Sequence, residues 1–266
     1  MSTIRRIATM AAMSVYRTYR SPGDLLWILV MPVVMSFVLS MWFGGFGESA
    51  AAGGPVVYDN PRGDDRLDSF PALRATFAVF LIFCLTALIT RAGNIHEERK
   101  GGTLARTLAC GIPYRDVVAA HVVSIGVTGV IQAALVLSIT GILGFDWLAA
   151  GWSALLLPTA VALFACAGIA VGIVGFVRNE GHLQLIVGAG PSLLAMFGGA
   201  FFPLDGAPAN IQRLTVVNPI YWSMEALDGG FVYQGIASQT GPLAILILVG
   251  VLGIVLGVQG LRRMEA

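Results

Sequence analysis

Charge is the property that this sequence has least of. Only 12% of its 266 residues are Asp, Glu, Lys or Arg, whereas soluble domains average about 25%. Hydrophobic residues make up 56% of the chain. This composition excludes an ordinary soluble fold and predicts an integral membrane protein. The net charge of +1 does not provide the broad basic field of a nucleic-acid-binding protein, so no nucleic-acid partner is expected.

Reactive side chains are scarce as well. Cys84, Cys110 and Cys166 have no spacing typical of a zinc site or a disulfide framework. The three histidines share no spacing with one another or with carboxylates, so no metal site is expected, and no Ser/His/Asp arrangement is visible. The P-loop pattern G-x-x-x-x-G-K-[S/T] is absent. The chain is therefore expected to be no enzyme and to bind no cofactor of its own.

Long uncharged runs are what the sequence does contain. A helix of about 20 apolar residues crosses the hydrocarbon of a bilayer, and six runs reach that length approximately. We predict an all-α fold with one transmembrane domain over residues 1–266. A signal peptide is the alternative for the first run, but that run is too long and follows a long preceding segment. The predicted spans are residues 25–43, 72–90, 117–143, 152–177, 183–202 and 242–260.

The predicted fourth span carries Gly168, Gly172 and Gly175. This spacing of small residues allows another helix to approach closely.

Residues 1–23 are predicted to form a basic amphipathic helix in the membrane interface. Arginines gather on one side of its helical wheel, and Pro22-Gly23 ends it. A solvated basic tail is the alternative interpretation. The apolar side consists of Ile4, Ile7, Ala8, Ala11, Val15 and Tyr19, and the basic side of Arg5, Arg6, Arg17 and Arg20.

The distribution of positive charge predicts the topology. Twelve of the 16 Lys and Arg residues fall at the termini, in the connector 91–121 and in the loop 178–182, all on one side of six spans. Cytoplasmic loops carry such an excess. We therefore expect both termini and the connector in the cytoplasm, and the loop 44–70 outside a plasma or inner membrane.

The connector Arg91 to His121 is the most charged segment between two apolar runs. An acidic pair and a basic pair precede Gly101-Gly102, and a helix-like stretch, Thr103 to Ala109, then leads to a break at Gly111 and Pro113. Thr103 is predicted to cap this helix. Leu104 and Leu108, one turn apart, are expected to anchor it on a partner. The alternative is a solvated loop that only sets topology.

A second motif follows the predicted fifth span. Prolines at 203, 208 and 219 would break helices, and Tyr221-Trp222 suits the membrane interface. An ordinary outer loop with interfacial aromatics is the alternative. Its characteristic residues are Phe202, Pro203, Pro208, Asn218, Pro219, Tyr221, Trp222 and Glu225.

Together these motifs resemble the permease subunits of the type-2 ATP-binding-cassette (ABC) transporter family. The family has an E-x-x-x-G-T-L-like segment between spans two and three, and a Pro-containing turn after it. His121 is a departure, because the family often has Lys near the start of span three. The matching residues are Glu98, Gly102, Thr103, Leu104 and Pro113.

The resemblance implies a function and partners. The connector would be a cytoplasmic coupling helix, and the second motif would form re-entrant helices outside. Separate ATPase subunits that bind ATP and magnesium would drive two permeases, identical or paralogous. They would export a lipid, an amphipathic drug or another molecule across the bilayer. The implied coupling residues are Glu97, Glu98, Gly102, Thr103, Leu104, Leu108 and Pro113.

Two other functions remain as alternatives. A secondary transporter or channel driven by an ion gradient needs ionisable residues within its spans, and the predicted spans have them only at their margins. A membrane-embedded enzyme needs a convergent catalytic set, which is not visible. Gln132, Ser138 and Gln184 are predicted to face a translocation path, although hydrogen bonding between helices explains them more simply.

Overall fold

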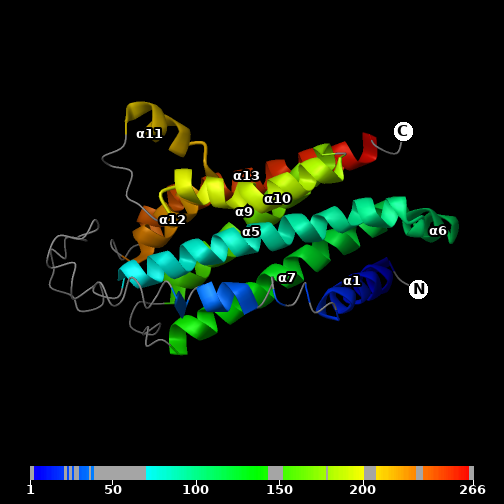
Figure 1. The fold of residues 1–266 in the computed structure, drawn as a ribbon, viewed down its shortest axis with the longest axis horizontal. Helices are drawn as coiled ribbons and strands as arrows, with labels where there is room; N and C mark the ends of the chain where they lie inside the picture. Colours follow the sequence, from blue (N-terminus) through cyan, green and yellow to red (C-terminus); the bar gives the residue numbers. More distant parts are fainter. Residues whose placement is uncertain are drawn as a thin grey trace, which may run out of the picture.

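One long helix, α5 (Phe70–Lys100), runs through the middle of the molecule (Figure 1). Its 31 residues extend about 46 Å at 1.5 Å per residue, well beyond the roughly 30 Å of a bilayer's hydrocarbon. Three other long helices, α7 (Tyr114–Ile142), α9 (Trp152–Phe176) and α10 (Glu180–Phe197), pack against it. The side chains of Phe80, Leu81, Leu85 and Leu88 are almost completely buried. The core of the molecule therefore follows α5.

The computed structural model describes residues 3–20, 23, 26, 30–35, 37–38, 70–142, 152–177, 179–200, 208–231 and 236–263. Every regular element among these residues is a helix, which confirms the all-α prediction. Short helical stretches occur at 31–35 and 37–38, inside the predicted first span. The remaining helices are α1 (Thr3–Tyr19), α6 (Thr103–Ala109), α7 (Tyr114–Ile142), α9 (Trp152–Phe176), α10 (Glu180–Phe197), α11 (Ala209–Thr215), α12 (Pro219–Phe231) and α13 (Ile236–Arg263).

Four of the described helices are long and apolar enough to cross a membrane. These are α5, α7, α9 and α13, and they correspond to the predicted second, third, fourth and sixth spans. Helix α10 has 18 residues and occupies the place of the fifth span, but it is not among the four. Most of the predicted first span and the loop 44–69 lie outside the described residues.

The predicted connector begins too early. The apolar run ends near residue 90, but the helix continues to Lys100, so residues 91–100 form part of α5. A helix can leave the bilayer without breaking, and Arg99 and Lys100 in its last turn suit the negative end of the helix dipole. We call residues 91–100 the α5 extension.

Other predicted boundaries also move. The polar loop 178–182 is shorter than predicted, because Asn179 caps α10 by accepting a bond from Gly181 N at 2.8 Å. Helix α10 ends at Phe197 and not at 202. Helix α13 begins at Ile236, before the predicted start at residue 242, so Pro242 lies in its interior.

Helices α9 and α13 approach each other backbone to backbone. A Cβ added at Gly168 would meet the backbone of Gly250, and one added at Gly175 would meet that of Gly257. The same holds from the other side, where a Cβ at Gly253 would meet Gly168. The predicted role of the glycine spacing in α9 is confirmed. Because no side chain separates the two backbones, the pair is closely fitted.

Different helices lie at the two ends of the molecule. Figure 1 shows α6, the start of α1 and the last turns of α13 at one end, and α11 and α12 at the opposite end. We call these the α6 end and the α12 end.

The glycine contact leads to a prediction. Gly253→Ala should lower the thermal midpoint of the detergent-solubilised protein, because overpacking costs roughly 1–3 kcal/mol. Gly126→Ala in α7 is the matched control, since a Cβ there meets nothing within 4 Å, and it should leave the midpoint unchanged or raise it. Equal midpoints for the two variants would contradict the close backbone contact.

Candidate functional site

Helix α6 is connected to α5 by a turn of two glycines. Gly101 N donates to the Glu97 carbonyl at 2.8 Å and ends α5, and Gly102 then takes a positive φ of 71°, which favours glycine. The predicted bounds of α6, Thr103 to Ala109, are confirmed. The break after it is confirmed as well: Gly111 has φ 78°, and α7 begins directly after Pro113.

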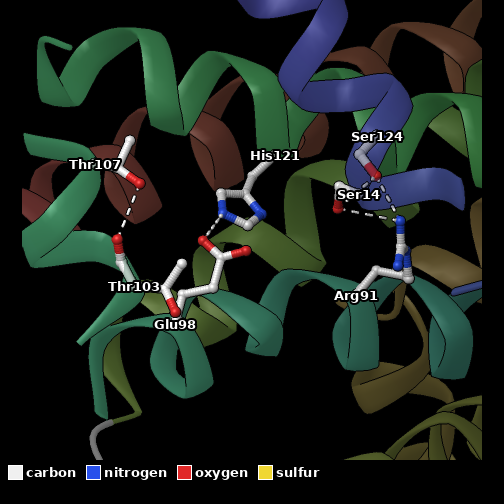
Figure 2. A network of polar contacts seen from close by, with 7 residues as sticks. All are labelled: Ser14, Arg91, Glu98, Thr103, Thr107, His121 and Ser124. Carbon is white, nitrogen blue, oxygen red and sulfur yellow. Dashed lines mark hydrogen bonds and ion pairs between the residues drawn. The ribbon is translucent and has the colours of Figure 1, made fainter. Parts of the chain in front are cut away.

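The predicted cap of α6 is wrong. Gly102 occupies the capping position with no side-chain bond, and Thr103 is the first helical residue. The Thr103 carbonyl instead accepts a bond from the Thr107 hydroxyl at 2.9 Å (Figure 2). The left-handed turn therefore starts the helix through its backbone conformation and not through a side chain.

One side of α6 is buried against its own chain. Leu104 is 7% exposed and Leu108 is half-buried, so these leucines hold α6 to its own chain and not to the partner that the sequence analysis expected. The outward surface consists of Thr103, Ala105, Arg106, Ala109 and Cys110.

Glu98 is paired within the chain. Its carboxylate lies 3.1 Å from His121 Nε2 on α7 (Figure 2), and because a carboxylate ion only accepts, the imidazole donates. Both side chains are largely buried. His121, the one departure from the family pattern, thus holds the family's glutamate. Its neighbour Glu97 is exposed.

Arg91 is not a connector residue in solvent. It is 3% exposed, and its guanidinium donates to Ser124 of α7 at 2.6 Å and to Ser14 of α1 at 3.4 Å (Figure 2). It lies directly after the predicted second span, at the margin where ionisable residues were expected.

Helix α1 runs alongside α7. Arg6 pairs with the buried Asp116 at 3.2 Å, and Ser14 accepts from Ser124 at 3.3 Å. The step from Arg6 to Ser14 on α1 equals the step from Asp116 to Ser124 on α7, so the two helices run in parallel. The predicted basic side is wrong for Arg6, because Asp116 draws it toward α7. The predicted apolar side is divided: Ala11 is buried, whereas Ile4 is 80% exposed.

The other face of the α5 extension contacts α9 and α10. His96 Nε2 lies 3.1 Å from the Val174 carbonyl oxygen, and Lys100 pairs with Glu180 at 2.8 Å. At about 100° per residue, Arg91 and Glu98 share one face, and His96 and Lys100 share the opposite face. The extension thus contacts α1 and α7 on one side and α9 and α10 on the other, directly before α6.

The α12 end contains the second predicted motif. Pro208 precedes α11, and Pro219 is the first residue of α12, a position that suits proline. Asn218 is buried and donates to the Leu194 carbonyl at 2.6 Å, while its side-chain oxygen accepts from Ile220 N. Two short helices therefore replace a free loop over the described part. Phe202 and Pro203 lie outside the described residues.

The remaining predicted residues of this motif lie on α12. Tyr221, Trp222 and Glu225 are half-buried, and Trp222 Nε1 donates to the Val216 carbonyl at 2.7 Å. Asp228, one turn after Glu225, pairs with Arg74 of α5 at 3.3 Å. Burial raises the pKa of Asp228 to about 6, and the Arg74 charge opposes that rise.

The three predicted path residues differ in exposure. Gln132 is 2% exposed inside the bundle. Ser138 is exposed and donates to its own helix at the Ala134 carbonyl. Gln184 is exposed on α10.

Comparison with known proteins identifies the family. The model of the family described as ABC-2 type transporter matches residues 5–232. The chain belongs to the ABC-2 type transporter family. It is also 26% identical over 191 residues to the linearmycin resistance permease protein LnrN of Bacillus subtilis (strain 168). That alignment covers 68% of this chain and 47% of the relative, so the match spans about half the relative's length.

Membership of the ABC-2 family makes the chain a multi-pass membrane permease. It favours this interpretation over the ion-gradient-driven transporter or channel. Sequence reasoning did not identify the residues whose side chains connect neighbouring helices: Arg6, Arg91, His96, Asp116 and His121. One signal was available: polar residues at inward-facing positions of apolar helices, such as His121 and Ser124, usually have partners on a neighbouring helix.

The ion pair between α1 and α7 leads to a second prediction. Arg6→Gln leaves the buried Asp116 charge without this partner, so α1 should exchange its amide hydrogens faster. The double variant Arg6→Gln/Asp116→Asn should exchange less fast than the single one, because unpaired buried charges cost about 3–5 kcal/mol. Hydrogen exchange with mass spectrometry measures both. A double variant at least as destabilised as the single one would contradict the pairing.

Proposed function

We propose that this permease is the transmembrane subunit of an ABC exporter whose α6 docks on a separate cytoplasmic ATPase. The observation that carries this proposal is the way in which α6 is attached to α5 and, through it, to the neighbouring helices. A short helix with four exposed residues stands at the end of a central helix whose last ten residues contact four neighbouring helices. A displacement of α6 would therefore be transmitted to the helices that the α5 extension contacts.

The α6 end faces the cytoplasm in this proposal. The start of α1, α6 and the end of α13 lie together (Figure 1), as an even number of crossings requires. Twelve of the 16 Lys and Arg residues belong to this side in the six-span topology, and positive charge favours the cytoplasmic side. Helices α11 and α12 then fold back from the outer side as re-entrant helices.

The ATPase subunit supplies the chemistry. It would bind ATP and magnesium, and its closure would move α6 and the α5 extension. Glu97 and the outward surface of α6 are the groups available for contact. Glu98, Gly102, Leu104, Leu108 and Pro113 hold α6 in place. Among them, Glu98 acts through His121.

Two permeases, identical or paralogous, would form the complete pathway. Gln184 on α10 is exposed and can line a path between two copies, whereas Gln132 is buried within one copy and is assigned to helix packing. The cargo would be a lipid, an amphipathic drug or another exported molecule. The relative's name, a linearmycin resistance permease, supports a drug among these candidates.

Sidedness can be measured with cysteines. Cys110 on α6 is exposed, whereas Cys84 and Cys166 are buried. An impermeant maleimide should label Cys110 only after cells are permeabilised. Arg213→Cys on α11, in a Cys110→Ser background, should be labelled in intact cells. The reverse pattern would invert the topology.

Docking can be tested on the outward surface of α6. Ala105→Trp should reduce co-purification of the ATPase about tenfold or more, because overpacking an interface costs roughly 1–3 kcal/mol. Ala237→Trp, an exposed alanine at the start of α13, is the matched control and should bind normally. If Ala105→Trp also binds and transports like the parent, α6 is not the docking element.

A further inference from the structure

His96 is the polar contact that the α5 extension makes with α9. The side chain is 9% exposed, and its Nε2 lies 3.1 Å from the Val174 carbonyl oxygen. A carbonyl oxygen only accepts hydrogen bonds, so the Nε2 nitrogen must carry the proton. The contact is therefore directional and defines the tautomer of the ring.

The acceptor lies in the last turn of α9, which ends at Phe176. The last carbonyls of a helix are the ones that groups outside the helix commonly bond. An imidazole N–H from another helix is such a group. This bond holds the end of α9 at a defined height along α5.

The same turn of α9 is fitted to α13. Gly175 follows Val174, and a Cβ placed there would meet the Gly257 backbone. A Cβ at Gly260 would in turn meet Gly175. A shift of α9 along its axis is therefore carried to α13, because the two backbones leave no space for independent movement.

Helix α13 continues this connection to the α12 end. Near its start, the Ser238 hydroxyl donates to the Gly229 carbonyl at 2.8 Å, and Gln239 donates to the Ala226 carbonyl at 3.0 Å. Both acceptors belong to α12. The described residues thus provide a continuous mechanical connection between the two ends of the molecule.

We propose that His96 is a positioning residue that couples the α5 extension to the α9–α13 pair, so that motion of α6 reaches α12 on the opposite side of the membrane. The proposal rests on the proposed function, in which an ATPase moves α6. It adds the route by which that motion crosses the bilayer. The contacts of Arg91 and Glu98 with α1 and α7 lie on the other face and do not belong to this route.

The first test needs no ATPase. Nitrogen-15 NMR of histidine-labelled protein in nanodiscs should show His96 protonated at Nε2 and hydrogen-bonded, with His96→Gln identifying its signal. An Nδ1-protonated, Nε2-free ring would overturn the proposal without bearing on the ATPase.

The second test uses the permease with its ATPase in liposomes. Spin labels on Arg115→Cys, an exposed position at the start of α7, and on Thr240→Cys of α13, both in a Cys110→Ser background, report the distance across the membrane, with and without ATP, magnesium and vanadate. His96→Leu removes the donor and should reduce the nucleotide-induced population of the shifted state roughly two- to tenfold, as expected for one neutral hydrogen bond. His96→Gln, which keeps a donor, should restore it at least in part.

The exposed His182 of α10 supplies the control, and His182→Leu should behave like the parent. Co-purification of the ATPase should be normal in all variants. If His96→Leu shows the parent's shift, or if His96→Gln fails like His96→Leu while both are folded and ATPase-bound, the coupling role is wrong. If the parent itself binds no ATPase, the proposed function fails, and the NMR result still decides whether the His96 contact exists.

Discussion

The unbroken hydrogen-bond ladder of α5 is the constraint on which the rest of the structure depends. Within hydrocarbon a helix must satisfy every backbone group internally, and α5 keeps this ladder past the point where its charges begin. It continues to Lys100 and ends at Gly101-Gly102. Only this continuation places Arg91 and Glu98 on one face and His96 and Lys100 on the other. The position of α6 and the contacts of four neighbouring helices follow from it.

Two kinds of contact hold the bundle together, and they meet in the last turn of α9. In a bilayer apolar surface gains little from leaving lipid, so close packing and hydrogen bonds drive association between helices. Helices α9 and α13 use close packing, through facing glycines. The α5 extension uses polar side chains that are directional. Close packing makes α9 and α13 a rigid pair, and the polar contacts connect that pair to the α5 extension.

Local signals in the sequence predicted much of this fold. The bounds of α6 are correct to the residue because Gly101-Gly102 and Gly111 to Pro113 lie in the chain close to its two ends. The long apolar runs likewise predicted α5, α7, α9 and α13. The pairing of Glu98 with His121 was missed because the two residues belong to different helices. The face that α1 presents to α7 depends on Asp116. That residue belongs to α7, so a helical wheel of α1 does not include it.

The function of the candidate site was readable only in part for the same reason. The motif identified Glu98 and Leu104 as important, but their contacts assign them to the support of α6. A residue's identity predicts what it can bind, whereas its burial decides whether the partner is another helix or another protein. Leu104, at 7% exposure, packs within its own chain, whereas Arg106, on the outward side, is exposed.

The two-glycine turn has a consequence for how such permeases can diversify. The direction of α6 is set by backbone conformation at Gly102, and four of its seven side chains face outward. Substitutions at those four positions leave the contacts that hold α6 to its own chain in place. In the proposed docking, such substitutions would alter which ATPase the permease binds and would leave the membrane-crossing helices unchanged.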